Sequence, residues 1–430
     1  MTFKVIETFS GIGAQAKALE RLKSKAILDY KIVSTVEWEI GALYAYDIIH
    51  NGKQNKNKYS GYSKEDLILQ LSGLNLSSDG KNPLLQNSLN RMPIEQLKAI
   101  KYSIERNNNL VDISGVSAID LPEANLLTYS FPCQDLSISS YWHGNFSGID
   151  KKIQNRSGLL WQIERILKEY IEIDKPLPRY LLMENVSAIH GPLHINNFNL
   201  WKEELNNLGY ENFDFDLDAK NFDIPQNRVR TFMISIYTKD LSELQKSKIK
   251  YHFSNTNLYK INTAPKIDEF LRLNYTNKQY LKEALESIPN NTPSRKKIRS
   301  NSRVLAEGTK TLNNIAKTIT TKQDRNPNAG IIIHQLDLPE NKADYRNLTP
   351  RETFLLMGFD ENDYERLINS NFNISKTRKF LSNSKLLKLT GNSIVVTILE
   401  KIFTELAYVD KTLINKETND LDTKLECIKI

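Results

Sequence analysis

The chain has 430 residues, with 58 Lys and Arg against 51 Asp and Glu and a formal net charge of +7 at pH 7. This length allows a full hydrophobic core and predicts two domains. No apolar run approaches the ~18 residues of a membrane span. Two cysteines far apart argue against a disulfide framework or zinc cluster and favour a reducing compartment. The charge favours a polyanionic partner, although a generally Lys-rich proteome explains it equally well.

The N-terminal stretch predicts a strand, a glycine-containing turn and a helix, at Lys4–Phe9, Ser10–Ala14 and Gln15–Leu22. Glycines in such a turn let a ligand approach the backbone N–H groups at a helix N-terminus. A second strand, Ile32–Val36, ends in Glu37-Trp38, where a carboxylate suits ribose hydroxyls and an indole can stack on adenine. Taken alone, these residues are as typical of a structural turn, a surface carboxylate and a core aromatic.

Residues 51–110 differ in composition, because they are rich in Asn, Ser and Lys and contain short amphipathic stretches such as Ile94–Ile104. This pattern is typical of an inserted, partly helical excursion on the surface. We expect Val111–Ile113 to return the chain to the sheet before the next strand.

The next feature is Cys133 and its surroundings. Leu126–Ser130 is apolar and β-favouring, and Pro132 ends the strand ladder because it has no N–H. Cys133 therefore lies just past a strand's C-terminal end, where open α/β sheets collect catalytic groups. A free cysteine is more often a small buried hydrophobe, so its function depends on its neighbours. The polar segment 137–157 has the length of a functional lid or a disordered loop.

Helices and strands continue to alternate after this segment. Helices are predicted at Gly158–Ile171 and Trp201–Leu208, and the strand Tyr180–Met183 leads into Glu184, at the same sheet edge as the cysteine. Residues 226–234 alternate as a strand does, which places three polar side chains on one face: Gln226, Arg228 and Arg230. Without a partner, such a face is normally solvated.

The positive charge is concentrated in one region. Residues 239–345 hold 19 Lys and Arg against 11 Asp and Glu, a net charge of +8, so the rest of the chain carries about −1. This stretch is rich in Asn, Thr and Ser and predicts a separate small domain with a polar loop at Thr318–Asn328. Gly391–Val396 then opens a helix that runs to about Leu406.

Taken together and in order, these stretches resemble the bacterial DNA (cytosine-5)-methyltransferases over residues 3–238 and 345–408. Each motif alone is weak evidence for this resemblance, whereas the whole set, in the family's order and at strand ends, is specific to the family. The insertion and the run Leu127–Ser137 are most similar to mollicute-type enzymes that methylate CG, but residues 239–345 vary with specificity, so this target is not carried over. Two stretches, Arg351-Glu352 and Leu356–Phe359, resemble the segment that supports the family's recognition domain.

The resemblance implies an α/β fold with four parts. These are a Rossmann-like S-adenosylmethionine-dependent catalytic domain at 1–238 with a surface insertion at about 51–110, a smaller, irregular target-recognition domain at 239–345, a supporting segment at 346–410 that returns to the catalytic domain, and a tail at 411–430. It also implies double-stranded DNA as partner, S-adenosyl-L-methionine as cofactor, S-adenosyl-L-homocysteine as product, no metal, and a monomer in the bacterial cytoplasm. A restriction-modification or an orphan role both stay open, and with them a separately encoded restriction endonuclease.

The site residues that the resemblance implies form three groups. The catalytic residues are Cys133, Glu184, Arg228 and Arg230. The cofactor-binding residues are Phe9, Ser10, Gly11, Ile12, Gly13, Glu37, Trp38, Asp112, Ile113, Pro132, Leu159, Asn392 and Ser393. The DNA-binding residues are Gln134, Ser137, Gln226, Arg295, Lys296, Lys297, Lys322, Gln323 and Arg325.

The implied chemistry explains these residue types. C5 of cytosine is a poor nucleophile, and addition of the Cys133 thiolate to C6 makes the ring enamine-like, so that C5 can attack a sulfonium methyl. Glu184 would bond the N3/N4 edge, which requires a carboxyl that is protonated or shares a proton with N3. Arg230 would donate to O2, with Arg228 in support. Residues 134–157 would close over a flipped base, because a stacked base is not accessible at C6.

Two other functions fit the sequence less well. One is an RNA (tRNA) cytosine-5 methyltransferase on the same fold, against which the large basic region favours DNA, because major-groove readout needs a dedicated surface. The other is a catalytically silent DNA-binding protein, against which the presence of Cys133, Glu184 and Arg230 argues.

Overall fold

A six-stranded sheet forms the centre of the structure. In spatial order it contains β2 (Tyr30–Val36), β1 (Phe3–Thr8), β3 (Leu126–Tyr129), β4 (Tyr180–Val186), β6 (Val229–Tyr237) and β5 (Tyr210–Asp218). The computed structural model describes residues 2–132, 136, 149–150, 157–256, 258 and 264–415. The first four strands are parallel, and β6 runs antiparallel to both of its neighbours.

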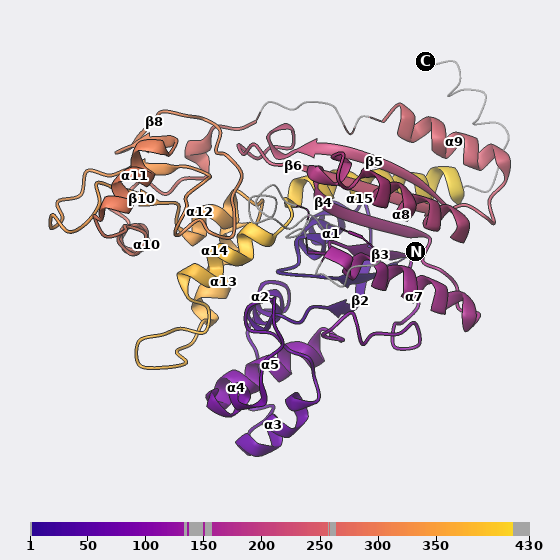
Figure 1. Ribbon diagram of the computed structural model, residues 1–430, viewed down its shortest axis with the longest axis horizontal. Coiled ribbons are helices and arrows are strands. Elements are labelled where there is room, and N and C mark those ends of the chain that lie inside the picture. Colours follow the sequence, from indigo (N-terminus) through magenta and orange to yellow (C-terminus); the bar gives the residue numbers. More distant parts are fainter. Residues whose placement is uncertain are drawn as a thin grey trace.

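Helices cover both faces of this sheet (Figure 1). One face packs with α1 (Ala14–Ser24), α2 (Ile40–Asn51) and α15 (Val396–Tyr408), and the other with α7 (Leu160–Glu172) and α8 (Ile195–Leu208). Leu126 and Leu182 belong to the first core, whereas Leu127 and Leu181 belong to the second, because side chains alternate along a strand. Burial on both faces explains why β3 and β4 are almost continuously apolar. The expected α/β fold is confirmed.

Residues 51–110 form a helical projection beside α2 (Figure 1). Its helices are α3 (Lys64–Ser72), α4 (Gln86–Arg91) and α5 (Ile94–Arg106). Leu97 and Ile100 of α5 are buried in the first core, and the Arg106 guanidinium lies 2.6 Å from the fully buried carboxylate of Asp47 in α2. The projection is therefore fastened to the main body by apolar contacts and a charge pair.

After this projection the chain does not return to the sheet as expected. Val111–Ile113 forms no strand in the described range 2–132, and Asn109 makes one isolated bridge to Thr35. The expectation is wrong because Val111 adopts φ +63°, a left-handed conformation that a β-branched residue rarely takes and that ends strand pairing.

A second, four-stranded sheet lies to one side of the first (left in Figure 1). It contains β10 (Tyr345–Asn347), β9 (Ile331–Ile333), β7 (Val304–Glu307) and β8 (Lys310–Thr311), accompanied by α10 (Lys278–Glu286) and α11 (Pro293–Asn301). The second sheet and these helices lie within residues 264–347, which we call the recognition unit after the role that the resemblance leads us to expect for residues 239–345.

The helix α9 (Glu243–Ser254) belongs to the main body instead. Its Ile249 and Phe253 are buried, and Phe253 stacks on Phe213 of β5 with ring centroids 4.6 Å apart. The separate domain expected from residue 239 therefore does not include α9, because the apolar side of this basic helix covers the edge of the main sheet.

The remaining helices return the chain to the main sheet. They are α12 (Pro350–Leu355), α13 (Glu361–Ser370), α14 (Asn383–Asn392) and α15, followed by a π-helical turn at Val409–Ile414. Tyr180 donates to Asp410 at 2.9 Å, at the end of the expected supporting segment. Gln245 of α9 donates to Ile414 O at 3.0 Å, so the first residues of the expected tail still pack on the main body. In the described ranges, none of the helices has the length and apolar character to cross a membrane.

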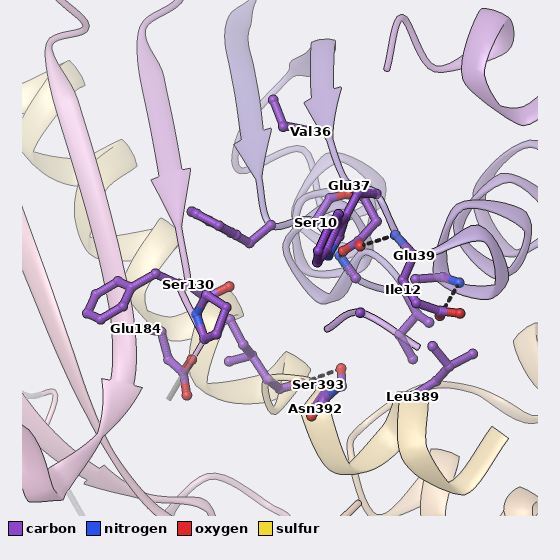
Figure 2. A pocket seen from close by; sticks show the side chains of 18 of the residues that line it. Ser10, Ile12, Val36, Glu37, Glu39, Ser130, Glu184, Leu389, Asn392 and Ser393 are labelled. Carbon is purple, nitrogen blue, oxygen red and sulfur yellow. Dashed lines mark hydrogen bonds between the residues drawn. The ribbon is translucent and has the colours of Figure 1, made fainter. Parts of the chain in front are cut away.

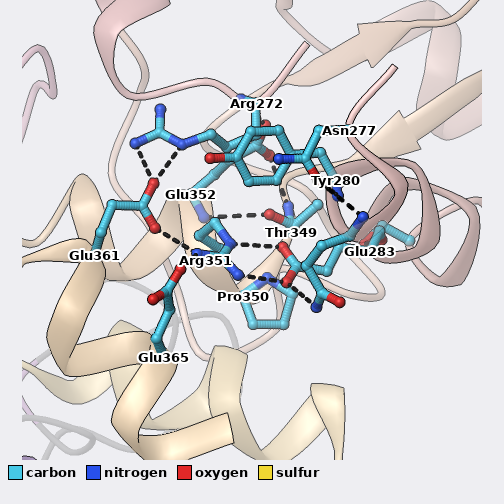
Figure 3. Close-up of polar contacts among 12 residues, drawn as sticks. Arg272, Asn277, Tyr280, Glu283, Thr349, Pro350, Arg351, Glu352, Glu361 and Glu365 are labelled. Carbon is cyan, nitrogen blue, oxygen red and sulfur yellow. Dashed lines mark hydrogen bonds and ion pairs between the residues drawn. The ribbon is translucent and has the colours of Figure 1, made fainter. Parts of the chain in front are cut away.

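An ionic junction joins the recognition unit to α12 and α13. Arg351 of α12 lies 2.9 Å from Glu283 of α10 and also pairs with Glu361 of α13, and Figure 3 shows its guanidinium between the two carboxylates. Arg272 of the recognition unit pairs with Glu361 as well. The whole junction consists of Arg272, Glu283, Arg346, Arg351, Glu352, Glu361 and Glu365.

Arg346 and Glu352 form the buried part of this junction. Both side chains are 0% exposed, and the guanidinium donates to both carboxylate oxygens, at 2.7 and 2.8 Å. Although burial opposes ionisation, Arg346 holds the pKa of Glu352 below its ordinary value. Removing one partner of such a pair typically costs about 3–5 kcal/mol. The junction is therefore expected to fix how the recognition unit is held against α12.

Candidate active site

A cavity of about 380 Å³ opens at the carboxyl ends of the parallel strands. In open α/β sheets this edge is where ligands bind. Residues after β1, β2 and β3 and at the end of β4 line it, together with residues of α14, as Figure 2 shows for Ser10, Glu37, Ser130, Glu184 and Asn392. All expected cofactor residues except Gly13 are among its lining residues.

The turn after β1 has a backbone conformation and close packing that require glycine. Gly13 adopts φ +78°, and a Cβ there would lie 2.2 Å from the His50 ring, so only glycine fits. Two non-glycine residues that line the cavity, Phe9 and Val111, also have positive φ, 55° and 63°. Backbone strain of this kind is concentrated at functional sites.

Glu37 connects the ends of β1 and β2. Its two carboxylate oxygens accept from the backbone N–H groups of Gly11 at 3.0 Å and Glu39 at 2.8 Å. Burial, opposed in part by these hydrogen bonds, raises the pKa of Glu37 to about 7. The carboxylate therefore lies in an enclosed position beside the glycine turn, with lone pairs left for hydroxyl donors.

Glu184 and Arg230 form a second polar group in the cavity. Arg230 Nε lies 3.4 Å from Glu184 Oε1, and both side chains are mostly buried. Burial raises the pKa of Glu184, whereas the charges of Arg230 and Arg228 oppose this rise. The site thus holds a carboxyl whose proton is retained to a higher pH than that of an exposed glutamate.

Two residues that the sequence interpretation missed fix the backbone next to Cys133. Asn185 Nδ2 donates to Phe131 O at 3.0 Å, and Ser157 Oγ donates to Pro132 O at 2.6 Å. Asn185 directly follows the expected catalytic Glu184, whereas no local signal marks Ser157. Cys133, Gln134, Ser137 and the expected lid at 137–148 and 151–156 lie outside the described residues.

Gln226 and Arg228 precede β6 and are buried. Gln226 is 0% exposed, donates to Leu356 O at 2.8 Å and accepts from the Ile319 N–H at 2.9 Å. Arg228 donates to Ile319 O at 2.9 Å and Ser393 O at 2.7 Å. The expected DNA contact of Gln226 is therefore wrong, because distant carbonyl and N–H groups satisfy its amide away from solvent.

These contacts bring a loop of the recognition unit to the cavity. A Cβ on Gly391 would lie 2.5 Å from the backbone of Thr320 and Thr321, so the loop and the end of α14 touch at a position that requires glycine. The polar loop that follows Thr318 is thus held against the candidate active site.

The other expected DNA residues differ in accessibility. Lys296, Lys297, Lys322 and Arg325 are exposed, and Arg295 is half-buried with its guanidinium donating to Arg325 O at 3.0 Å. Gln323 is 0% exposed and accepts from the Ala329 N–H, which corrects its expected DNA contact. No set of three metal-ligating side chains gathers anywhere in the described ranges.

Comparisons with known proteins show which family the chain is similar to. The profile of the C-5 cytosine-specific DNA methylases matches residues 66–407. The chain is 33% identical to the orphan methyltransferase M.SssI of Spiroplasma monobiae over 93% of this chain and 96% of that protein. It is 31% identical to the type II methyltransferase M2.ScrFI of Lactococcus lactis subsp. cremoris over 94% and 98% of the two chains.

Solved structures show the same fold. The Dnmt2 methyltransferase of S. pombe superposes with a TM-score of 0.57 at 16% identity, covering 96% of this chain and 100% of that one. The Entamoeba histolytica methyltransferase EhMeth superposes with a TM-score of 0.53 at 16% identity, covering 96% and 99%.

Proposed function

This chain belongs to the C-5 cytosine-specific DNA methylases, and we propose that its cavity holds S-adenosyl-L-methionine next to a cytosine flipped out of a DNA duplex. As a member of this family it methylates C5 of cytosine in DNA. One observation carries the proposal: Glu184 and Arg230 line the same cavity as the glycine turn and Glu37. Groups suited to a cytosine and groups suited to an adenosine thus meet in one space.

The lining residues fit the cofactor that the family implies. A Cβ on Gly11 would have no atom within 4 Å, so the turn after β1 faces open space at a helix N-terminus. Glu37 offers a carboxylate to ribose hydroxyls, Trp38 and Ile113 offer apolar surfaces to an adenine, and Asp112 offers an acceptor to its amino group. When bound, S-adenosyl-L-methionine supplies a methyl group activated by a sulfonium centre.

In the proposed reaction, the Cys133 thiolate forms a bond to C6 of cytosine and moves electron density to C5. C5 takes the methyl group and then loses its own proton to a base, after which the S–C6 bond breaks and the thiolate is released. Glu184 shares a proton with N3, which its raised pKa supports, and Arg230 donates to O2. Asn185 and Ser157 position the backbone that leads into Cys133.

The test is incubation with tritiated S-adenosyl-L-methionine and either duplex DNA or total tRNA. We expect label in the duplex and none above background in tRNA. Label in tRNA alone would overturn the proposal. Bisulfite sequencing of DNA from an expressing host then identifies the methylated sequence. The relatives carry the descriptions orphan and type II methyltransferase, so we propose a modification methylase of one of these two kinds.

A Glu37→Ala variant is expected to bind S-adenosyl-L-methionine at least about tenfold more weakly, the loss expected when one hydrogen bond to a charged group is removed. The measurement is isothermal calorimetry without DNA. Glu65→Ala, the same change on the exposed surface of α3, is the matched control and should bind as the wild type does. An unchanged dissociation constant for Glu37→Ala would count against its role at the ribose.

Exposed basic residues of the recognition unit are expected to divide into two kinds. Lys296→Ala should weaken binding to every duplex and reduce the slope of log K against log salt by about one, as loss of one phosphate contact does. Arg325→Ala should instead change which sequence is methylated, by about 1–3 kcal/mol of discrimination for a lost base contact. Fluorescence anisotropy over a salt series and bisulfite sequencing measure the two effects. Equal losses of slope and specificity in both variants would contradict the division.

A further inference from the structure

We propose that the inserted projection forms one wall of the cofactor site. In this wall, Asn75 is a positioning residue that orients the carboxylate of Asp112. This inference rests on the proposed function, because it assigns one wall of the cavity to S-adenosyl-L-methionine. The relevant part of the projection is Asn75–Gly80, between α3 and α4, which we call the insertion strap. Asn75, Asp79 and Gly80 line the cavity.

The insertion strap runs along the segment that follows β2. Ser77 N donates to Trp38 O at 2.8 Å, and Ile40 N donates to Ser77 O at 2.9 Å. Ser77 is fully buried, and the neighbouring Leu76 is part of the first core. The strap is thereby held in register with the residues that carry Glu37 and Trp38.

The far end of the strap is fastened to α14. Lys388 Nζ donates to the backbone carbonyl of Asp79, and Lys388 itself lines the cavity three residues before Gly391. A neighbouring pair joins α14 to the residue that precedes α2, because Lys385 Nζ lies 3.0 Å from Glu39 Oε1. The strap therefore spans from the end of β2 to α14 and closes one side of the cavity.

Asn75 connects this strap to the expected adenine contact. Its Nδ2 donates to Asp112 Oδ2 at 2.5 Å, while Asp112 Oδ1 accepts from the Ser114 N–H at 3.0 Å. The two hydrogen bonds fix the plane of the carboxylate, which lies next to the strained backbone of Val111. A carboxylate held in this orientation can accept from an exocyclic amino group without a further loss of rotamer freedom.

The decisive experiment measures binding of S-adenosyl-L-homocysteine without DNA. Asn75→Ala should raise the dissociation constant by about fivefold, the loss expected from one hydrogen bond, and raise the KM for S-adenosyl-L-methionine to the same extent. Its kcat and its affinity for duplex DNA should stay unchanged. Asn90→Ala, an exposed residue of α4 outside the cavity, is the matched control and should change none of these values.

A double-mutant cycle separates positioning from general loosening of the structure. If Asn75 acts through Asp112, then Asn75→Ala should have no further effect on the dissociation constant when Asp112 is already alanine. Equal losses in both backgrounds, or wild-type binding by a folded Asn75→Ala variant, would overturn the inference. If the wild type itself does not bind S-adenosyl-L-homocysteine, the proposed function fails instead, so the two failures are distinguishable.

Discussion

A Cys133→Ser variant is expected to lose methyl transfer while it binds S-adenosyl-L-methionine with the affinity of the wild type. A serine hydroxyl does not ionise near neutral pH, so no thiolate-like nucleophile is left to add to C6. Binding should persist because the glycine turn and Glu37 follow β1 and β2, whereas Cys133 follows β3 in the sequence. Tritium incorporation into duplex DNA and calorimetry measure the two quantities separately.

The second cysteine provides the control for this experiment. Cys427 lies near the end of the chain, outside the described residues, and carries no part of the proposed chemistry. Cys427→Ser should therefore retain full activity. Residual turnover by Cys133→Ser within about tenfold of the wild type, a difference of only 1.4 kcal/mol in the barrier, would exclude covalent catalysis by this thiol.

A Glu184→Gln variant is expected to lose about 10²- to 10⁴-fold in single-turnover rate, the usual contribution of a positioned proton donor. Glutamine keeps the shape and a donor group but cannot share a proton with N3. Cofactor affinity should stay unchanged, because the expected adenosine contacts lie in segments that follow β1 and β2 and at residues 112–113, not on β4. Rapid-quench kinetics with saturating DNA and cofactor is the measurement, and a loss below about tenfold would contradict the assigned role.

The same carboxyl predicts a pH dependence. Burial raises the pKa of Glu184, so its protonated form persists to a higher pH than in an exposed glutamate, and the wild-type rate should fall as pH rises through that pKa. Arg230 lowers the pKa of Glu184, so Arg230→Ala should move the descending limb to higher pH. Glu184→Gln should lack that limb.

The parts of the site that could be predicted from the sequence lie immediately after apolar strands. Glu37 and Glu184 each occur at the carboxyl end of a run whose pattern is local, so their meeting at one sheet edge follows from the parallel topology. The turn at Gly11 and Gly13 is predictable for the same reason, because glycine marks a local backbone requirement.

The other features depend on contacts between distant segments, which no local pattern reveals. The alternating sequence around Gln226 is typical of a strand whose polar face is solvated. Its amide is instead bound to Ile319, 93 positions away, and Arg228 is bound to Ser393, 165 positions away. Val111 reads as a strand residue but is turned into the left-handed region between Asn109 and Asp112. The insertion strap likewise has no pattern that indicates a cavity wall, because its role comes from its contacts with Trp38, Asp112 and Lys388.

The ionic junction restricts how modules of different specificity can be exchanged between relatives. A foreign module inserted at 264–345 would bring its own side chains at positions 272 and 283 against the host's Arg351 and Glu361. A donor without an acidic residue at position 283 would leave the buried Arg351 without one of its partners, at a cost that approaches the roughly 3–5 kcal/mol of a broken buried pair. Such a chimera would unfold at a lower temperature than the host protein, whichever DNA sequence its loops recognise. Viable exchanges should therefore come from donors that share these charges, or from grafts that extend through α13.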